Sequence, residues 1–473
     1  MPTLTPDLAV IGAGSGGLSV AAGAVQMGAR VVLIEKGRMG GDCLNHGCVP
    51  SKSLLAAAHV ARTIRTGGTL GVNCHEPEID LAAVRRHVRE VIAGIAPHDS
   101  IERFEGLGVR VIQGEARFTG RLELEAAGIR LRPRRVVLAT GSRAAIPPVP
   151  GLATVPYLTN ETIFELAERP ERLVILGGGP IGCELAQAHR RLGTPVTLLQ
   201  RRTILPRDDP AAVEVVRRAL LTDGVDLREG VEVCGVERHG DRIALRAVTD
   251  GGEEVVEGSH LLVAAGRQAH TEGLDLEAAG IEHGPKGVTT DSSLRTTNRK
   301  VWAVGDVTGR WQFTHVAGYH AGVVIRQALF RLPARVDDRA VPWVTYTDPE
   351  LAQVGLTEQA AGARGLRLEA LTSPFAENDR ARTERRPEGF AKVLVVKRGQ
   401  VHGATIVGSH AGELIPLWCL VIQERIGIGK VARMIAPYPT LAEISKRAAG
   451  GYYTPRLFSE RTRKLVRLLS RLG

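Results

Sequence analysis

Two cysteines separated by four residues form the most reactive feature of this sequence. Cys43 and Cys48 can close a small disulfide ring, because Gly47 between them relaxes the backbone. Pro50 suits the first turn of a helix that begins beside Cys48, and Lys52 follows in the next turn. A helix N-terminus and a nearby cation both favour a thiolate. A zinc site would need further paired ligands, and the other four cysteines are scattered singly. The spacing therefore predicts a redox-active dithiol and no metal site.

A glycine-rich loop lies upstream of the cysteine pair. Gly12, Gly14 and Gly17 follow the apolar run 7–11 and open an alanine-rich helix, as in dinucleotide-binding βαβ units. Glu35 ends the next apolar run, where a carboxylate can accept hydrogen bonds from ribose hydroxyls. The free N–H groups at such a helix N-terminus favour a pyrophosphate. We therefore predict that a nucleotide binds beside the dithiol.

The same pattern recurs 165 residues later in the chain, with one difference. Gly177, Gly179 and Gly182 again follow an apolar run and open a helix, but the second run ends in Gln-Arg-Arg instead of an acid. The cations Arg201 and Arg202 suit a 2′-phosphate, which a carboxylate would repel. This favours NADPH over NADH. The alternative is a pair of solvated arginines at a strand end, with NADH possible.

Composition limits the class of protein. The hydrophobic fraction is 44% and the charged fraction 24%, as in ordinary globular proteins. No apolar stretch reaches the roughly 18 residues of a membrane span, and the N-terminus lacks the basic region of a signal peptide. With few cysteines for its length, the chain is expected to be cytoplasmic. The formal charge of +10 is spread along the chain, so we expect no nucleic-acid partner.

The segment 455–472 has a pattern of its own. Phe458, Leu465, Leu469 and Leu472 recur at helical spacing, and basic residues occupy other positions. A basic amphipathic helix can lie on an acidic membrane surface or on an acidic partner. Such helices more often pack their apolar stripe on their own protein, so we expect that arrangement and regard membrane contact as the alternative.

Along nearly the whole chain, the motifs resemble, in order, those of the FAD-dependent pyridine nucleotide-disulfide oxidoreductases with Cys-x4-Cys pairs. This family includes dihydrolipoamide dehydrogenase, glutathione reductase and mercuric reductase. The Pro50-Ser51-Lys52 variant and Gln200-Arg201 are most similar to mercuric-reductase-like members. Besides both glycine loops and the cysteine segment, the resemblance is carried by Ala139-Thr140-Gly141-Ser142, Glu184, Ala265-Gly266-Arg267, Gly305-Asp306, Thr314-His315-Val316-Ala317, Asp348 to Gly355 and Pro439 to Glu443.

The resemblance implies an α/β fold with two Rossmann-like dinucleotide-binding domains, for FAD and NAD(P), plus a C-terminal α+β dimerisation domain. We expect residues 1–150 to form the first part of the FAD-binding domain with the redox cysteine pair. Residues 151–271 would form the NAD(P)-binding domain, and 272–335 the second part of the FAD-binding domain. Residues 341–473 would form the dimerisation domain of a homodimer.

The resemblance also implies roles for particular residues. Lys52 would lie near flavin N5 and pair with Glu184, Cys48 would face the flavin, and Cys43 would attack the substrate. NADPH would be held by Gly177, Gly179, Gly182, Arg201, Arg202 and Gly266. FAD would be held by Gly12, Gly14, Gly17, Glu35, Lys36, Gly41, Asp42, Lys52, Ala116, Thr140, Gly141, Ser142, Asp306, Thr314 and His315.

The chain departs from the family pattern in two ways. Tyr438 stands where the disulfide reductases have a histidine acid–base, although Glu443, which orients that histidine, is retained. In the implied homodimer, both would serve the other subunit's cysteines. The chain also ends without the adjacent cysteines that hand over metal in mercuric reductases. His46, inside the cysteine loop, is either a local base or, as we favour, a solvent-facing residue.

These features predict an enzyme that moves electrons from NADPH through FAD to the Cys43–Cys48 disulfide. The final acceptor would be a small-molecule or protein disulfide, a thiol-bound metal or a related group. The first alternative is an NAD-linked dihydrolipoamide dehydrogenase, against which Tyr438 and the missing acid at position 200 argue. The second is a redox-sensing flavoprotein that does not turn over.

Overall fold

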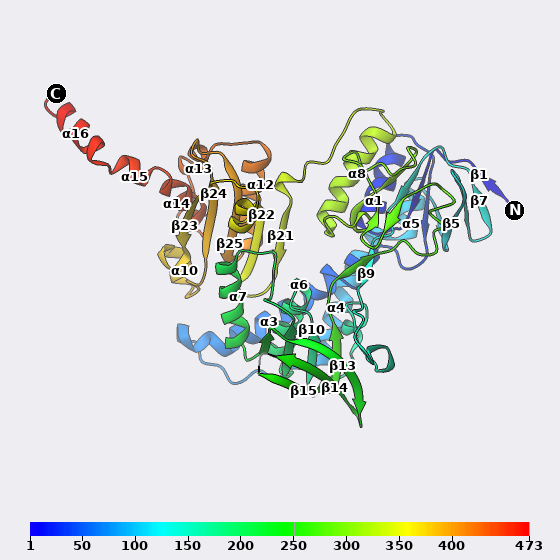
Figure 1. The fold of residues 1–473 in the computed structure, drawn as a ribbon, viewed down its shortest axis with the longest axis horizontal. Coiled ribbons are helices and arrows are strands. Elements are labelled where there is room, and N and C mark those ends of the chain that lie inside the picture. Colours follow the sequence, from blue (N-terminus) through cyan, green and yellow to red (C-terminus); the bar gives the residue numbers. More distant parts are fainter. Residues whose placement is uncertain (250, 473) are drawn as a thin grey trace. The chain divides into compact units, whose positions relative to one another are not determined.

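The computed structural model describes residues 1–249 and 251–472, drawn in Figure 1. The chain forms two compact units. The first unit comprises Met1–Arg201 and Gly230–Asp337, and the second comprises Arg202–Glu229 and Asp338–Gly473. Each unit has its own apolar core.

A five-stranded parallel sheet in the order β20-β8-β2-β3-β4 forms the centre of the first unit. All of β2 (Leu8–Ile11) is buried, as expected for a strand covered on both faces. Leu8 and Val10 belong to one apolar core, and Ala9 and Ile11 belong to the other, because side chains alternate along a strand. The other strands are β3 (Val31–Glu35), β4 (Arg110–Gln113), β8 (Val136–Leu138) and β20 (Val301–Ala303).

Helices α1 (Ser15–Gln26) and α8 (Thr314–Ala328) pack against each other. Both contribute residues to the same apolar core as Leu8 and Val10. These two helices therefore cover one face of the parallel sheet, and each begins beside residues expected to bind a nucleotide.

A second parallel arrangement in the same unit joins β11, β10 and β16 in that order. Strand β10 (Leu173–Leu176) leads into α6 (Pro180–Arg191), and β11 (Val196–Gln200) follows. This strand–loop–helix–strand order repeats that of β2, α1 and β3, so the structure contains both βαβ units expected from the glycine loops. Strand β16 covers His260–Val263.

Smaller elements complete the first unit. An antiparallel pair, β9 with β17, joins Ser142–Ala144 to Arg267–Ala269. The helices are α2 (Gly41–Asn45), α3 (Cys48–Thr66), α4 (Leu81–Ile95) and α5 (Ile101–Gly106). The remaining strands are β1 (Thr3–Leu4), β5 (Ala116–Gly120), β6 (Glu123–Ala126), β7 (Ile129–Leu131), β13 (Glu232–His239), β14 (Arg242–Thr249), β15 (Gly252–Gly258), β18 (His283–Gly284) and β19 (Gly287–Val288).

The second unit contains a five-stranded antiparallel sheet in the order β21-β22-β25-β24-β23. Trp418 is fully buried in its core, and the indole Nε1–H donates to Ser445 Oγ at 3.1 Å. The strands of this sheet are β21 (Pro342–Thr345), β22 (Glu350–Gly355), β23 (Glu369–Pro374), β24 (Phe390–Val395) and β25 (Val401–Gly408). The unit also contains β12 (Asp226–Glu229), which is not part of this sheet. The helices are α7 (Pro210–Thr222), α9 (Glu358–Ala363), α10 (Asp379–Thr383), α11 (Ala411–Leu414), α12 (Pro416–Gln423), α13 (Ile428–Ala432), α14 (Glu443–Gly451), α15 (Thr454–Leu457) and α16 (Glu460–Leu469).

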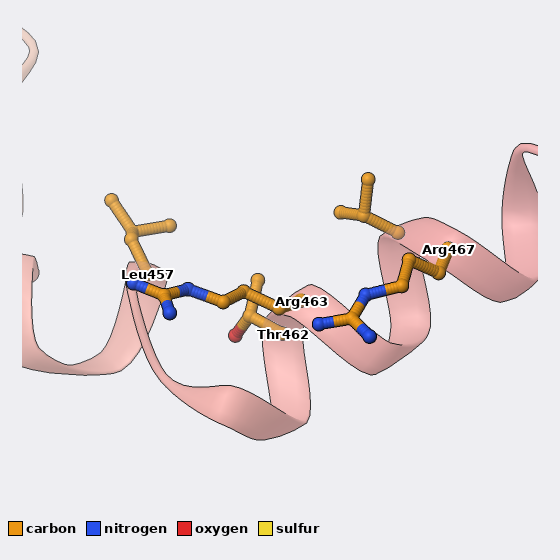
Figure 2. A pocket seen from close by; sticks show the side chains of 5 residues that line it. Leu457, Thr462, Arg463 and Arg467 are labelled. Atoms are coloured by element: carbon orange, nitrogen blue, oxygen red, sulfur yellow. The ribbon is translucent and has the colours of Figure 1, made fainter.

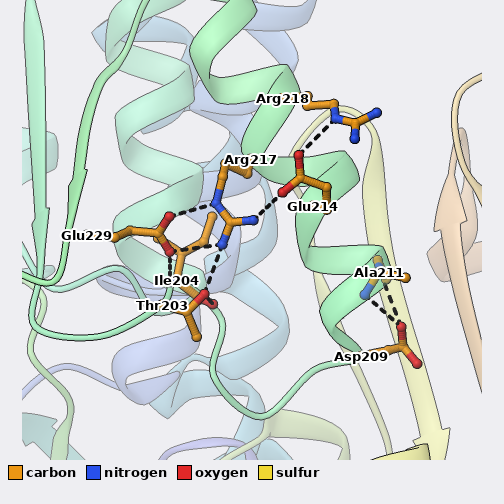
Figure 3. A network of polar contacts seen from close by, with 9 residues as sticks. Thr203, Ile204, Asp209, Ala211, Glu214, Arg217, Arg218 and Glu229 are labelled. Carbon is orange, nitrogen blue, oxygen red and sulfur yellow. Dashed lines mark hydrogen bonds and ion pairs between the residues drawn. The ribbon is translucent and has the colours of Figure 1, made fainter.

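A network of charged groups holds the segment 202–229 together, as Figure 3 shows. The Arg217 guanidinium donates to both carboxylate oxygens of Glu229, at 2.6 and 3.0 Å, and to Thr203 Oγ1 at 2.9 Å. Arg217 also pairs with Glu214 on the same helix. Glu229 in turn accepts the Ile204 N–H at 2.6 Å. These contacts tie α7 to β12 and to the loop that precedes the helix.

The C-terminal helix differs from our expectation. Helix α16 has no buried residue, so its apolar stripe does not pack on its own chain. In Figure 1, α15 and α16 extend beyond α14 at the end of the second unit. A stripe of helical spacing identifies an amphipathic helix but does not say what covers the stripe, and here nothing in the described chain does.

The expected fold class is confirmed. The chain has a mixed α/β architecture with parallel sheets in nucleotide-binding arrangements and a separate antiparallel sheet with helices. Among the helices within residues 1–249 and 251–472, none is both long enough and apolar enough to cross a membrane.

Candidate active site

The two cysteines lie on consecutive helices of the first unit. Cys43 is inside α2, and Cys48 is the first residue of α3. Gly47 at the N-cap of α3 supplies no side chain to cap the helix, so the first-turn N–H groups are free of a side-chain acceptor. Thr314, the first residue of α8, places its hydroxyl 3.7 Å from Cys48 Sγ. The structure therefore brings Thr314, which was expected at the FAD site, close to Cys48.

The surroundings divide the two thiols into a thiolate and a thiol. A hydrogen bond from Cys43 and the positive charge of Lys52 lower the pKa of Cys48 to about 6, although burial and Glu184 oppose this. The hydrogen bond to Cys48 and burial raise the pKa of Cys43 far above its usual range. In the reduced pair, these shifts favour the negative charge on Cys48 and the proton on Cys43.

The cation beside Cys48 is fixed by a buried acid. Lys52 Nζ lies 2.7 Å from Glu184 Oε2. Glu184 belongs to α6, the helix of the second glycine loop, and its side chain is only 6% exposed. A buried carboxylate requires such a partner, because leaving it unpaired is costly. The expected pairing of Lys52 with Glu184 is present in the structure.

A second ionic contact holds the start of the cysteine segment. Arg267 on β17 places Nη2 3.0 Å from Asp42 Oδ2, and its side chain is only 15% exposed. The Asn160 amide donates to Asp42 Oδ1 at 2.9 Å and approaches the His46 carbonyl at 3.4 Å. Asp42 directly precedes Cys43, so these groups fix the backbone on which that thiol is mounted.

Arg267 also connects the cysteine segment to a buried acid. Its Nε donates to Ser142 Oγ at 2.8 Å, and Ser142 Oγ donates to Asp306 Oδ2 at 2.5 Å. Burial raises the pKa of Asp306, although Ser142 and Arg267 lower it in part. Asp42, Ser142 and Asp306 were each expected at the FAD site, and the structure places them in one cluster around Arg267.

The three glycines of the first loop are required for different structural reasons. Gly12 has φ +102°, and a Cβ there would lie 2.3 Å from the Ala139 carbonyl oxygen. A Cβ on Gly17 would lie 1.8 Å from the Gly12 carbonyl oxygen, so both positions exclude side chains for packing reasons. Gly14 is different, because its Cβ would meet only Gly41 Cα at 3.8 Å. The side-chain-free edge at Gly14 leaves room for a ligand.

The second loop repeats this division. A Cβ on Gly177 or Gly182 would strike a backbone oxygen at 2.4 or 1.8 Å, whereas a Cβ on Gly179 would meet nothing within 4 Å. Neither α1 nor α6 has a side-chain cap at its N-terminus. Uncapped first-turn N–H groups beside an open glycine are what a pyrophosphate requires.

The last residues of β3 and β11, the strands that follow the two glycine loops, make equivalent contacts with those loops. Glu35 Oε2 accepts the Ala13 N–H at 2.6 Å, and Gln200 Oε1 accepts the Gly178 N–H at 2.8 Å. Gln200 therefore takes over the loop-bracing role of the acid without its charge. Arg201, the next residue, forms an exposed ion pair with Glu232 at 2.9 Å.

The remaining nucleotide-site candidates lie as follows. Lys36 follows β3 and pairs with Glu115 on the surface at 3.4 Å. Thr140 Oγ1 donates to the His270 carbonyl at 2.7 Å. Arg202 is exposed and His46 is half-buried. Other candidates are Gly41 in α2, Ala116 at the start of β5, Gly141 at φ +71°, Gly266 at φ +134° and His315 in the first turn of α8.

Tyr438 and Glu443 belong to the second unit. The Tyr438 side chain is 70% exposed, and its hydroxyl donates to Asp379 Oδ2 at 3.1 Å. This hydrogen bond and the Asp379 charge raise the pKa of Tyr438 above its usual value of 10.0. Glu443 begins α14, where Oε2 accepts the Thr440 N–H at 3.5 Å. Tyr438 is therefore a poor base at neutral pH.

Sequence reasoning assigned no role to four residues that the structure connects to the candidate site. They are Arg267 and Asn160 around Asp42, Asp379 at Tyr438, and Glu232 at Arg201. Arg267 stands in the Ala265-Gly266-Arg267 motif that carries part of the family resemblance, and this motif was a usable signal. The other three are remote in sequence from their partners, and no spacing rule connects them.

The ionisation of Cys48 predicts how the reduced protein reacts with an alkylating agent. The rate of Cys48 alkylation by iodoacetamide should rise with pH through a midpoint near 6, because only the thiolate reacts. Removing the cation with Lys52→Met should raise this midpoint, and removing the opposing charge with Glu184→Gln should lower it. Peptide mass spectrometry after timed quenching measures the rate at each cysteine.

A midpoint near the ordinary thiol value, about 8.5, would contradict the assignment of the thiolate to Cys48. Shifts of the same sign in both variants would show that they disturb the fold rather than the local charge. Alkylation of Cys43 ahead of Cys48 would reverse the division of roles within the pair.

Comparison with protein families covers almost the whole chain. Residues 6–321 match the model described as pyridine nucleotide-disulphide oxidoreductase. Residues 341–449 match the dimerisation domain of the same family. The match therefore includes both nucleotide loops, the cysteine pair and the sheet of the second unit.

Curated relatives carry two different names. A mercuric reductase of Staphylococcus aureus is 36% identical over 446 residues, covering 94% of this chain and 82% of the relative. A mercuric reductase of Streptomyces lividans is 34% identical, with 94% and 95% covered. A dihydrolipoyl dehydrogenase of Chlamydia muridarum is 33% identical, with 94% and 96% covered.

Solved structures of similar fold align with similar fractions of this chain. The Cu(II) complex of the HOCl-induced flavoprotein disulfide reductase RclA from Escherichia coli has a TM-score of 0.83 at 28% identity, covering 93% of this chain and 98% of that one. LpdA from Mycobacterium tuberculosis has a TM-score of 0.86 at 26% identity, with 97% and 100% covered. The family binds FAD and uses pyridine nucleotides. This chain is an oxidoreductase that belongs to the pyridine nucleotide-disulfide oxidoreductase family.

Proposed function

We propose that this enzyme passes electrons from NADPH through FAD to the Cys43–Cys48 disulfide, and from the resulting dithiol to a disulfide or a thiol-bound metal ion. The observation that carries the proposal is the placement of Cys48 at the start of α3, beside the Thr314 hydroxyl and near the charge of Lys52, which lowers the pKa of Cys48. NADPH supplies two electrons and one proton, which together convert the disulfide into a thiolate on Cys48 and a thiol on Cys43.

When bound, FAD would supply the hydride and electron transfer that connects the nicotinamide to the disulfide. The residues fit this cofactor because Gly14 and α1 leave an open, uncapped anion site, and Asp306 is a buried acid with hydrogen-bonding capacity. Lys52 would keep Cys48 ionised after reduction, and Arg267 would hold Asp42, and so Cys43, in place. Glu35, Thr140 and Ser142 would complete the site.

The chemistry of the two thiols indicates which class of electron acceptor the enzyme can reduce. Cys43 keeps its proton until a base removes it or Cys48 receives it, after which its sulfur can attack a disulfide or bind a soft metal ion. Relatives of this chain are named for mercuric ion, and a structural neighbour was solved as a Cu(II) complex. These names support a metal ion bound by thiolates as one acceptor.

The dimerisation domain supports a homodimer in which Tyr438 and Glu443 serve the partner's cysteines. Both residues belong to the domain that matches the family's dimerisation model. Tyr438 can donate a hydrogen bond to a thiolate or orient a bound metal, but it is not a neutral-pH base.

We expect NADPH to be preferred, with Arg201 as the residue that decides it. Hydrogen bonds to charged groups contribute about 1.5–3 kcal/mol, and the exposure of Arg201 places its phosphate contact at the lower end of this range. Arg201→Gln should therefore lower kcat/KM for NADPH about tenfold and leave NADH unchanged. Steady-state kinetics with both coenzymes measures the ratio.

Glu232→Gln is the matched variant, because Glu232 holds the same guanidinium. It should retain or increase the preference for NADPH, since the phosphate no longer competes with a carboxylate. If the wild-type enzyme prefers NADH, or if both variants lose NADPH activity equally, Arg201 is only a solvated residue at a strand end.

We expect slow turnover with lipoamide and glutathione disulfide, despite rapid NADPH-dependent reduction of the cysteine pair. Thiol exchange needs a base for the attacking thiol and a proton for the leaving thiolate. An imidazole does both near neutrality, whereas the pKa of Tyr438 is raised above an already high value. Tyr438→His should raise disulfide turnover and move its pH optimum toward neutral.

Tyr438→Phe is the control, because it removes the hydroxyl without adding a base and should leave disulfide turnover slow. A wild-type rate of about 10²–10³ s⁻¹ with lipoamide, typical of a dedicated enzyme, would contradict this account. His46, which lies between the two cysteines in sequence, would then be the next base to test.

A further inference from the structure

The C-terminal helix presents a surface that electron transfer does not use. Leu465, Leu469 and Leu472 are 54%, 55% and 77% exposed, and no residue of α16 is buried. Single exposed leucines are ordinary, but a contiguous exposed apolar stripe marks an interaction site. The stripe therefore calls for an occupant outside the described part of this chain.

Most apolar and most cationic side chains of the C-terminal helix lie on different sides of it. At about 100° per residue, one side carries Leu465, Leu468, Leu469 and Leu472, and Arg461 lies on this side near the N-terminal end of α16. The opposite side carries Arg463, Lys464, Arg467 and Arg471. Glu460 is the only acidic residue between positions 455 and 472, and it pairs with Arg463 at 3.7 Å.

A shallow groove lies beside Arg463 and Arg467, and none of the four leucines of the apolar side lines it. It has a volume of about 320 Å³ and is lined by Leu457, Thr462, Arg463, Val466 and Arg467. Figure 2 shows the Arg463 and Arg467 side chains running in the same direction along the helix. The groove thus offers apolar contacts together with two guanidinium groups, which suits a molecule with both an acyl chain and a phosphate.

We propose that α16 lies on an anionic lipid surface, with its leucines in the boundary between headgroups and acyl chains and its arginines on lipid phosphates. Arginine and lysine on the polar face are the mark of helices that bind in this way. A juxtaposed anionic surface attracts each base, and the attraction weakens as salt increases. No helix described within residues 1–249 and 251–472 can span a membrane, so the contact is peripheral.

Charge complementarity favours lipid over a second copy of this chain. Another copy would bring the same basic helix, and pairing through the leucines would leave both cationic faces without a role. The family's dimerisation domain also ends at residue 449, before α15 and α16 begin. The lipid contact is independent of the electron acceptor, so its test does not depend on the proposed function.

The test is cosedimentation of the full-length, FAD-loaded enzyme with vesicles. One set is pure phosphatidylcholine, and in the other about one third of the lipid is phosphatidylglycerol. We expect at least about tenfold stronger partitioning to the anionic vesicles, reduced by high salt. The apolar-face variant L465S/L469S and the basic-face variant R463E/R467E should each lose at least about tenfold of this binding.

The matched control is R364E/R367E, which makes the same charge change at two exposed positions of the same unit. It should keep vesicle binding, and all three variants should keep wild-type NADPH consumption. Equal loss in R364E/R367E would show that net charge alone drives binding and would overturn the proposal. Absence of vesicle binding, or L465S/L469S weakening the dimer instead, would assign the stripe to another occupant and also overturn it.

Discussion

The Lys52–Glu184 ion pair is the contact on which the candidate site depends. Glu184 is buried on the helix of the second nucleotide loop, so it needs a cation at 2.7 Å, and Lys52 on the cysteine helix supplies it. That same cation lowers the pKa of Cys48. A single pair thus joins the helix that follows the second glycine loop to the helix that begins at Cys48, and it places a positive charge near this thiol.

A second set of contacts, centred on Arg267, holds Cys43 in position. Arg267 contacts Asp42 and reaches Asp306 through Ser142, so the cysteine segment and Asp306 share one guanidinium. Lys52 acts mainly through charge, whereas Arg267 acts through position, because it fixes the residue that precedes the thiol. Different cations therefore act on the two thiols, which have four residues between them.

Much of this arrangement was predictable from sequence. The glycine loops, the strand ends at Glu35 and Gln200 and the helix at Cys48 follow from local patterns, and the structure has them where expected. Contacts such as Asn160 with Asp42 or Tyr438 with Asp379 join residues 118 and 59 positions apart, which no local rule connects. Helix α16 was misjudged for another reason: periodicity defines an apolar face, but its occupant depends on tertiary structure.

The central claim is that the Cys43–Cys48 pair receives the electrons of NADPH. The most direct measurement adds one equivalent of NADPH anaerobically to the oxidised, FAD-loaded enzyme, quenches with an alkylating agent and locates the label by mass spectrometry. The account predicts that both Cys43 and Cys48 are alkylated after NADPH addition and that neither is labelled without it. Oxidation of NADPH while the pair remains a disulfide would contradict the account.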